Sequence, residues 1–471
     1  MTLRFDNSLA RDLPGLSLRL DPDAAPAPRL LALNRGLASD LGLDLPALEE
    51  AAAGWFSGAV PVPGAEPVAL AYAGHQFGGF SPVLGDGRAH LLGEIVVPDG
   101  RRVDLQLKGS GRTPFSRGGD GKAAVGPMLR EYLVSEAMHA LGVPTTRALA
   151  VVATGEEIWR DAGRLPGAVL ARVAASHIRV GTFQFLAARG DVAALRALAD
   201  HTLARHFPGV TGGALGLFDA VAARQARLIA QWMGLGFVHG VMNTDNMALS
   251  GETIDYGPCA FIEGYAPGTV FSSIDRQGRY ALANQPLILG WNLARLAEAL
   301  LPLIDADGER AVGIANERLG RIAPAYEAEW LAVMRLKLGL DDSDPEDAAL
   351  VRDLLAAMTG ADWTLVFYRL AGAAEGDAGL LRPLFADFAA MEAWLPRWQA
   401  RRPDAARMRA ANPAVIPRNH QVEAALEAAT AGDMAPFHAL LAAVTQPFAA
   451  DPAYMLPAPS GFGRYVTFCG T

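Results

Sequence analysis

The chain has 471 residues, a formal net charge of −9 and a sequence pI of about 5.5. Hydrophobic residues make up 51% and charged residues 19%, which is typical of a packed globular protein with room for two or three domain-sized units. The acidic balance argues against a general nucleic-acid binder, because phosphate backbones require clustered basic residues. No apolar run approaches the roughly 20 residues of a membrane span, and the first residues lack a signal-peptide core. We expect a cytoplasmic protein with neither nucleic-acid nor membrane partners.

The N-terminal part of the chain predicts an extension over residues 1–67 followed by a sheet-rich lobe over 68–180. The extension mixes short helical pieces with Pro/Ala-rich linkers. In the lobe, the runs 90–97 and 101–108 flank an Asp-Gly turn, and the second run alternates charged and apolar residues as a half-buried strand does. A glycine-rich loop over 109–121 follows. The next pattern predicts a helix over 125–141, and further strands are expected at 148–153 and 168–173.

From Gly190 the pattern is mostly helical. An amphipathic stretch from Leu217 to Met233 leads into a polar loop that begins at His239. After Asp255 the sequence predicts helices to about residue 450. We expect a larger helical lobe over 181–300 and a helical extension over 301–471. A sheet-rich lobe before a helical lobe, with the polar loop after the junction, is the two-lobed α+β order of a protein-kinase-like fold.

Four residues follow the order of a kinase-type nucleotide site. Lys108 ends a predicted strand, Glu131 lies in the next helix, and Asn246 and Asp255 follow in the loop after His239. In kinases the corresponding residues are a lysine for phosphates, a glutamate that holds it, and an Asn and an Asp-x-Gly aspartate for metal. The kinase catalytic aspartate falls two residues after the histidine, and this chain has Val241 there. The pattern therefore predicts a metal-nucleotide site without the usual base.

An ammonium group at the end of a strand can reach phosphate oxygens in a cleft between lobes. Glu131 and Glu136 both lie on the following helix, and their directions differ by about 140°, so only one of them can face Lys108. The alternative is that all three are solvated surface charges.

Asn246 and Asp255 provide the oxygen ligands that a hard divalent ion prefers. Asp245 is the carboxylate that is placed to replace the missing base. The alternative for all three residues is a turn, because Asn, Asp and Gly are common turn formers. His239 is expected to be structural and to hold the loop through backbone hydrogen bonds.

Two glycine-rich loops, 85–88 and 118–121, are expected near the cleft, although neither fits the Walker or dinucleotide patterns. Arg172 and Arg179 lie seven residues apart and are candidates for two further phosphate contacts. Each is equally compatible with a surface ion pair.

Several long strings in the chain resemble the selenoprotein O family. They are Tyr72-Ala-Gly-His-Gln-Phe-Gly78, Leu84-Gly-Asp-Gly-Arg-Ala89, Lys108-Gly-Ser-Gly-Arg-Thr-Pro-Phe-Ser-Arg-Gly-Gly-Asp-Gly121, His239-Gly-Val-Met-Asn-Thr-Asp-Asn246 and Asn412-Pro-Ala-Val-Ile-Pro-Arg-Asn-His420. The resemblance runs from near Phe5 to the C-terminal cysteine. It implies a protein-kinase-like fold and protein adenylyltransferase activity, in which AMP passes from ATP to Ser, Thr or Tyr hydroxyls. ATP is expected in an orientation reversed from that in kinases.

The resemblance also implies a role for each matching residue. Asp245 is expected to act as base, Glu131 to pair with Lys108, and Asn246 and Asp255 to bind Mg²⁺ or Mn²⁺. The nucleotide is expected to contact Gly85, Gly87, Arg88, Lys108, Asp120, Gly121, Arg172, Arg179 and Asp255. Some family members carry selenocysteine near the C-terminus, whereas this chain has Cys469.

Cys259 and Cys469 are the two cysteines of the chain, too few for a disulfide scaffold or a zinc site. Cys259 lies just after the Asp255-Tyr-Gly257 motif, and Cys469 lies in the C-terminal tail. Our hypothesis is that they form a reversible disulfide that gates access to the site. Two unrelated thiols in a reducing cytoplasm are the alternative.

Other functions compatible with the residues are γ-phosphate transfer by a kinase with Asp245 as base, uridylyl transfer from UTP, and a silent scaffold that binds nucleotide. The presence of Lys108, Glu131, Asp245, Asn246 and Asp255 together argues against the scaffold.

Overall fold

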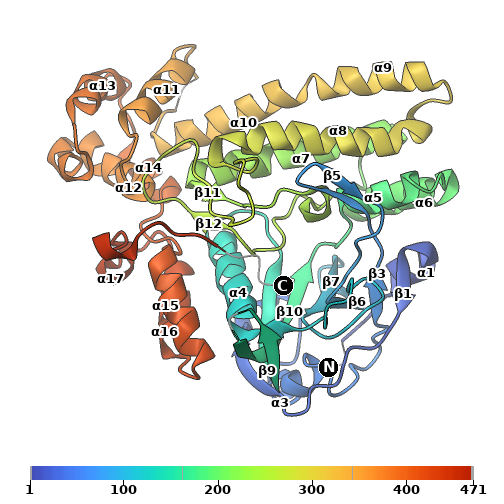
Figure 1. Cartoon of the computed structure of the whole chain (residues 1–471). Coiled ribbons are helices and arrows are strands. Elements are labelled where there is room, and N and C mark those ends of the chain that lie inside the picture. Colours follow the sequence, from blue (N-terminus) through green and yellow to red (C-terminus); the bar gives the residue numbers. More distant parts are fainter. Residues whose placement is uncertain (1–2, 162, 342, 468–471) are drawn as a thin grey trace.

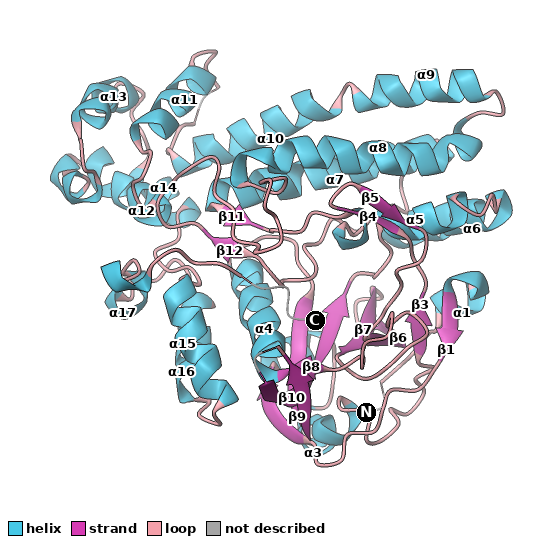
Figure 2. Cartoon of the chain, viewed as in Figure 1, coloured by secondary structure: helices cyan, strands magenta, loops and turns pink. Residues whose placement is uncertain are grey.

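The structure is a computed structural model, and it describes residues 3–161, 163–341 and 343–467. The chain folds as an α+β protein with a sheet-rich N-terminal part and a helical C-terminal part (Figure 1). Figure 2 shows the strands gathered beneath a layer of long helices, with a second group of helices at the C-terminal end.

One large antiparallel sheet dominates the N-terminal part. Its strands are ordered β1-β3-β6-β7-β10-β9-β2, and β8 pairs with β10 beside this path. The strands are β1 (Ser17–Arg19), β2 (Arg29–Leu33), β3 (Val68–Leu70), β6 (Ala89–Val96), β7 (Arg102–Lys108), β8 (Ala123–Ala124), β9 (Arg147–Arg160) and β10 (Gly163–Ala174). Two short hairpins lie outside it, formed by β4 (Gly74–Gln76) with β5 (Gly79–Ser81) and by β11 (Phe237–Val238) with β12 (Ala260–Phe261).

Helices cover both faces of this sheet. They are α1 (Ser8–Asp12), α2 (Arg35–Asp40), α3 (Leu45–Trp55) and α4 (Val125–Ala140). Leu105 and Leu107 of β7 pack with α2 and α3 on one face. Since side chains alternate along a strand, Gln106 and Lys108 point to the opposite face, which α4 covers. The period-two pattern in the sequence therefore decides that Lys108 faces α4.

The segment 1–67 belongs to the same sheet as the strands that follow it. The sequence pattern indicated only short helices and linkers here, yet β1 pairs with β3 and β2 pairs with β9. β1 has only three residues, and β2 is apolar throughout after Arg29, so neither strand shows a period-two pattern.

The helical part contains the remaining helices. They are α5 (Val180–Ala187), α6 (Val192–His206), α7 (Gly213–Leu235), α8 (Gln285–Ile304), α9 (Gly308–Leu319), α10 (Ile322–Lys337), α11 (Asp347–Ala357), α12 (Trp363–Ala374), α13 (Ala389–Gln399), α14 (Ala405–Ala411), α15 (Asn419–Thr430), α16 (Ala435–Val444) and α17 (Pro452–Met455). The amphipathic stretch expected over 217–233 lies within α7, and the helix expected over 125–141 is α4.

The prediction of helices directly after Asp255 is wrong. Apart from the two-residue strand β12, the chain from 256 to 281 is irregular, and α8 begins only at Gln285. Gly257, Pro258, Gly264 and Pro267 interrupt this stretch, and both residue types disfavour a helix interior.

The expectation that no run has the length and apolar character of a membrane span is wrong by composition, because the run Leu282–Ile304, which contains α8, has both. Its buried residues pack instead against α5, α7 and α9 in the core of the helical part. A buried face of this kind is what a central helix of a globular protein requires.

The C-terminal helices α15 and α16 pack against α4 rather than behind the helical layer (Figure 1). Met128, Leu129 and Tyr132 of α4 share one hydrophobic cluster with Leu426 of α15 and Phe437 of α16. As a result α4 lies between the sheet and the C-terminal helices, and packing against both of them fixes its position.

Candidate active site

A cavity of about 520 Å³ opens between the sheet and the loops that follow α7. Every predicted base, metal or nucleotide residue lines it: Gly85, Gly87, Arg88, Lys108, Asp120, Gly121, Arg172, Arg179, Asp245, Asn246 and Asp255. Glu131 lies behind Lys108, on α4. The fold thus brings residues that are dispersed along the chain to a single site, and their individual roles toward a ligand stay predictions.

Lys108 is the centre of a buried ion-pair network. Its Nζ donates to Glu131 Oε2 and to Asp255 Oδ1, each at 2.5 Å. Glu136, the other glutamate of α4, pairs with Arg147 at 2.7 Å and accepts from the backbone of Ala148. The prediction that only one glutamate faces Lys108 is confirmed, and that glutamate is Glu131. The reading of these residues as solvated surface charges is wrong.

Two buried arginines complete the network. Arg172 of β10 donates to Glu131 Oε1 at 2.9 Å and to Asp255 Oδ1 at 2.7 Å. Arg179, the residue before α5, donates to Asp255 Oδ2 at 3.2 Å and to the carbonyl of Asp245 at 2.7 Å. Both arginines are at most 3% exposed, so they are not surface ion-pair partners. They bring two fixed positive charges to the cavity wall.

Asp255 has a backbone φ of 65°, in the left-handed region that non-glycine residues seldom adopt. Such strain persists only where the surroundings hold it in place, and active sites are a common location. Burial alone would raise the pKa of Asp255, but Lys108, Arg172 and Arg179 outweigh burial and hold this pKa well below its usual range. Asp255 is therefore a carboxylate at any physiological pH.

Asp245 lies in a short 3₁₀ turn, Thr244–Asn246. Its Oδ2 accepts from Gln76 Nε2 at 2.9 Å, while its Oδ1 is buried and has no hydrogen-bond partner among the described residues. Burial raises the pKa of Asp245. A carboxylate with one oxygen fixed and the other without a partner, at a cavity wall, is suited to accept a proton.

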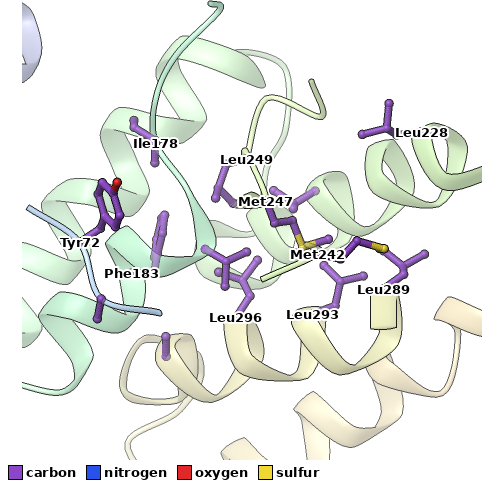
Figure 3. Close-up of a cluster of buried hydrophobic side chains, with 14 of the residues drawn as sticks. Tyr72, Ile178, Phe183, Leu228, Met242, Met247, Leu249, Leu289, Leu293 and Leu296 are labelled. Atoms are coloured by element: carbon purple, nitrogen blue, oxygen red, sulfur yellow. The ribbon is translucent and has the colours of Figure 1, made fainter. Parts of the chain in front are cut away.

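Apolar anchors hold the polar loop on both sides (Figure 3). Met242 and Met247 flank residues 243–246 and pack into the core with Leu289 and Leu293 of α8. His239 is buried, stacks on Trp232 at 5.2 Å, and lies 2.9 Å from the Ile254 carbonyl through its Nε2. The prediction that His239 is structural is confirmed. Val241, two residues after His239, also lines the cavity.

The turn at 85–88 lies directly against the loop 109–121. A Cβ on Gly85 would come within 2.2 Å of the Phe115 ring, and one on Gly121 within 2.0 Å of the Gly111 carbonyl. Thr113 donates to the Asp86 carbonyl at 2.7 Å. Gly85 is required by the close approach of the two loops, and Gly121 by the close approach of the two ends of the loop 109–121. The two loops form one wall of the cavity. Asp120 on this wall pairs with Arg160 at 2.8 Å.

No group of three or more His, Cys, Asp or Glu side chains suited to a metal ion occurs in the described part of the chain. Asn246 donates its amide nitrogen to the Val241 carbonyl at 3.0 Å, which leaves its Oδ1 for another contact. Together with Asp255 it offers two hard oxygen donors on the cavity wall. Mg²⁺ is commonly held by one or two protein oxygens plus phosphate oxygens and water. The donor set therefore fits a divalent ion shared with a bound phosphate.

Sequence reasoning missed several residues of the site. Asp86 is fully enclosed, lies 3.9 Å from Arg179, and has a pKa of about 6, raised by burial. Tyr72 stacks under the Arg179 guanidinium at 4.6 Å. Gln76, at the end of β4, donates to Asp245 at 2.9 Å, and Asn243 Oδ1 accepts from the Tyr280 hydroxyl at 2.6 Å. Tyr72, Gln76 and Asp86 lie in the strings that carry the resemblance, but no local pattern indicates what they contact.

Arg130 of α4 also reaches this region. It donates to the carbonyls of Gly257 and Cys259 at 3.2 and 2.7 Å and pairs with Glu423 of α15 at 3.0 Å. The hydroxyl of Tyr465, in the C-terminal tail, also donates to Glu423. One buried arginine thus joins α4, the segment after Asp255 and the C-terminal part.

Cys259 is fully buried, and burial raises its pKa to about 11. Cys469 lies outside the described residues. The nearest described part of the tail is Thr467, whose hydroxyl donates to the Pro258 carbonyl at 2.9 Å.

Comparison with known proteins identifies the family. A sequence model described as protein adenylyltransferase SelO matches residues 1–445. The chain belongs to the SelO family. It is 64% identical to the protein nucleotidyltransferase YdiU of Cereibacter sphaeroides strain KD131, over the full length of both chains. Proteins of the same name from Mycobacterium sp. strain KMS and Pseudarthrobacter chlorophenolicus are 58% and 56% identical and are matched over all of this chain and 99% of theirs.

Membership of the SelO family makes the chain an enzyme of the nucleotidyltransferase class. The family strings contribute part of the cavity wall, including Lys108, Asp245 and Asn246. This cavity is therefore the candidate nucleotide site of a SelO-family enzyme.

Proposed function

We propose that this enzyme transfers AMP from ATP to Ser, Thr or Tyr hydroxyls of proteins and releases pyrophosphate. The observation that carries the proposal is the arrangement around Asp245. Its Oδ1 is buried, has no hydrogen-bond partner in the described part of the chain, and lies on a residue that lines the cavity together with Lys108, Arg172 and Arg179. Adenylyl transfer is supported by three findings together: the nucleotidyltransferase class of the enzyme, the oxygen of Asp245 that has no described partner, and the positively charged side chains on the cavity wall.

The proposed chemistry is an in-line displacement at the α-phosphorus. Asp245 removes the proton of the acceptor hydroxyl, the hydroxyl oxygen forms a bond to phosphorus, and the bond to pyrophosphate breaks. Lys108 and the two arginines stabilise the negative charge that accumulates on the phosphate oxygens. A divalent ion at Asn246 and Asp255, for which we propose Mg²⁺ or Mn²⁺, would supply further charge neutralisation.

We also propose that ATP binds in the orientation reversed from that in kinases, within a protein-kinase-like two-lobed fold. The order of the sheet-rich part, α4 with Glu131, and the loop with Asn246 and Asp255 supports this fold. Reversal moves the reacting phosphorus from γ to α, and the base then lies at Asp245 instead of position 241.

The test uses ATP labelled at either the α- or the γ-phosphate. The purified enzyme is incubated with a protein acceptor and Mg²⁺ or Mn²⁺, and protein-bound label is counted. Label from α only, lost in Asp255→Ala, is the expected result. Label from γ would make the enzyme a kinase, label from α-labelled UTP alone would make it a uridylyltransferase, and no label under reducing conditions would favour a nucleotide-binding scaffold.

The disulfide between Cys259 and Cys469 is part of the same proposal. The contact of Thr467 with Pro258 supports it, because it brings the described end of the tail beside the residue before Cys259. Oxidation by a small disulfide such as oxidised glutathione would join the two sulfurs and release two reduced thiols. Unchanged electrophoretic mobility and activity after oxidation, in wild type and Cys469→Ser alike, would contradict it.

A further inference from the structure

The hairpin of β4 and β5 carries an aromatic residue in an unusual place. Its two-residue loop is Phe77-Gly78, with φ values of 52° and 87°. Two-residue loops with positive φ at both positions normally contain Asn, Asp or Gly, because a bulky side chain is strained there. Phe77 therefore occupies a position that backbone preference disfavours, which points to a function of its ring.

Polar contacts fix this loop beside the predicted base. The Phe77 amide N–H lies 3.1 Å from Asn243 Oδ1 and 3.2 Å from the Tyr280 hydroxyl. Its ring lies 5.0 Å from the Tyr280 ring. Phe77 lines the cavity next to Gln76, the residue that donates to Asp245, and Ile274 also lines the cavity.

An apolar surface continues outward from this end of the cavity. Phe80 is 45% exposed, Ile274 is 53% exposed and Leu287 of α8 is 72% exposed. His75 connects Phe80 to Trp291, with ring centroids 4.9 and 5.2 Å away. Leu287 and Trp291 are four residues apart and share a helix face. We call Phe77, Phe80, Ile274, Leu287 and Trp291 the mouth surface; Figure 2 shows its hairpin beside α5 and α8.

A cation lies at this surface, and no described carboxylate pairs with it. Arg279 stacks over Trp291 at 4.6 Å, and its Nε and Nη2 are buried with no hydrogen-bond partner among the described residues. Arg295, on the other side of the same ring, pairs with Glu298 at 2.6 Å. Buried guanidinium groups are normally paired, so the uncompensated charge of Arg279 favours an acidic group of a bound segment close to this surface.

We propose that the mouth surface docks an extended segment of the protein substrate, with an apolar side chain beside the acceptor hydroxyl and an acidic residue at Arg279. This inference rests on the proposed function and describes how the enzyme selects the protein segment that carries the acceptor hydroxyl. The surface is continuous with the cavity, so a segment lying on Phe80 and Leu287 delivers its hydroxyl toward Asp245. Apolar contact supplies affinity, and Arg279 supplies charge selection.

The experiment uses synthetic peptides of one acceptor Ser each, flanked by Leu and Asp, by Leu and Lys, or by Ser alone. Transfer of label from α-labelled ATP is measured against peptide concentration. We expect the Leu/Asp peptide to have the lowest KM and Phe80→Ser with Leu287→Ser to raise it about tenfold, with kcat changed less. Phe448→Ser with Leu456→Ser is the matched control, since these side chains are 42% and 63% exposed and lie elsewhere. Arg279→Gln is expected to remove only the preference for Asp over Lys.

Equal KM values for the three peptides, or no effect of the double variant, would overturn the docking surface. Binding of the same peptides, labelled with a fluorophore and followed by anisotropy, separates this failure from failure of the proposed function. Peptide binding that is lost in the double variant, without transfer of label, would reject adenylyl transfer but retain the surface. Absence of both binding and transfer would reject the surface. A change in oligomeric state of the double variant at unchanged KM would assign the surface to a second copy of the chain.

Discussion

Arg130 and Glu131 are adjacent on α4, and both hold the segment that carries Asp255. Glu131 acts through Lys108, which contacts both carboxylates at 2.5 Å. Arg130 acts through the carbonyls of Gly257 and Cys259. Because the sheet and α15–α16 pack on α4, the position of the segment that carries Asp255 depends on the C-terminal part of the chain as well as on the sheet.

The first prediction concerns Arg130. Arg130→Met removes the donor of two backbone carbonyls, so we expect the free energy of unfolding to fall by about 2–4 kcal/mol. Urea denaturation measures it. Glu423→Gln is the control, and we expect a change of less than about 1 kcal/mol because the Glu423 side chain is 46% exposed. Equal stabilities of Arg130→Met and wild type would show that these contacts contribute nothing.

The second prediction compares Glu131 with Glu136. Glu131→Gln weakens the hold on Lys108, and we expect transferase activity to fall about 10²-fold or more. Glu136→Gln weakens its pair with Arg147, so we expect a stability loss of about 1–2 kcal/mol with activity retained below the melting temperature. Initial rates and thermal melts are measured for both variants. Similar losses of activity in the two variants would argue against a specific role of Glu131.

The third prediction concerns Asp245. Asp245→Asn keeps an oxygen that can accept from Gln76 but removes the proton acceptor, so we expect kcat to fall about 10²–10⁴-fold. Since burial disfavours its charged form, we expect unchanged or higher thermal stability. Nucleotide binding, followed by calorimetry, is expected to persist. Asp219→Asn on α7 is the control, because its side chain is 44% exposed and pairs only with Arg318 among the described residues. An Asp245→Asn enzyme with normal kcat would exclude the proposed base.

The fourth prediction concerns the pH dependence of stability at Glu252. Burial raises its pKa to about 7, Asp104 adds to this effect and Arg205 opposes it. The unfolded chain ionises near 4.5, so between pH 4.5 and 7 the unfolded state loses its proton while the folded state keeps it. Glu252 therefore lowers stability progressively as pH rises through this window.

Glu252→Gln removes this effect and retains an oxygen for the hydrogen bond from Ala175. We expect the variant to gain about 1–3 kcal/mol relative to wild type between pH 5 and pH 8. Urea unfolding at the two pH values measures the gain, with the exposed Glu427→Gln as control. A difference that is independent of pH would show that Glu252 has an ordinary pKa in the folded protein.

The sequence by itself determined the local parts of the site. Alternation in β7 decides that Lys108 shares a face with Gln106, and the helical period decides that Glu131 and Glu136 cannot both face it. The strings around 72–89, 108–121 and 239–246 determined the family. These features depend on the spacing and type of residues that are close in the sequence, so they can be recognised without knowledge of the fold.

Only the tertiary structure decided which partners those residues meet. Arg172 and Arg179 both contact Asp255, and Gln76 donates to Asp245. The helices α15 and α16 pack against α4. All of these contacts join segments that are far apart in the chain. Such contacts follow from how sheet and helices bury their apolar faces together, and no local pattern records them. The same holds for β1 and β2, whose short runs become strands only because a neighbouring strand supplies their hydrogen-bond partners.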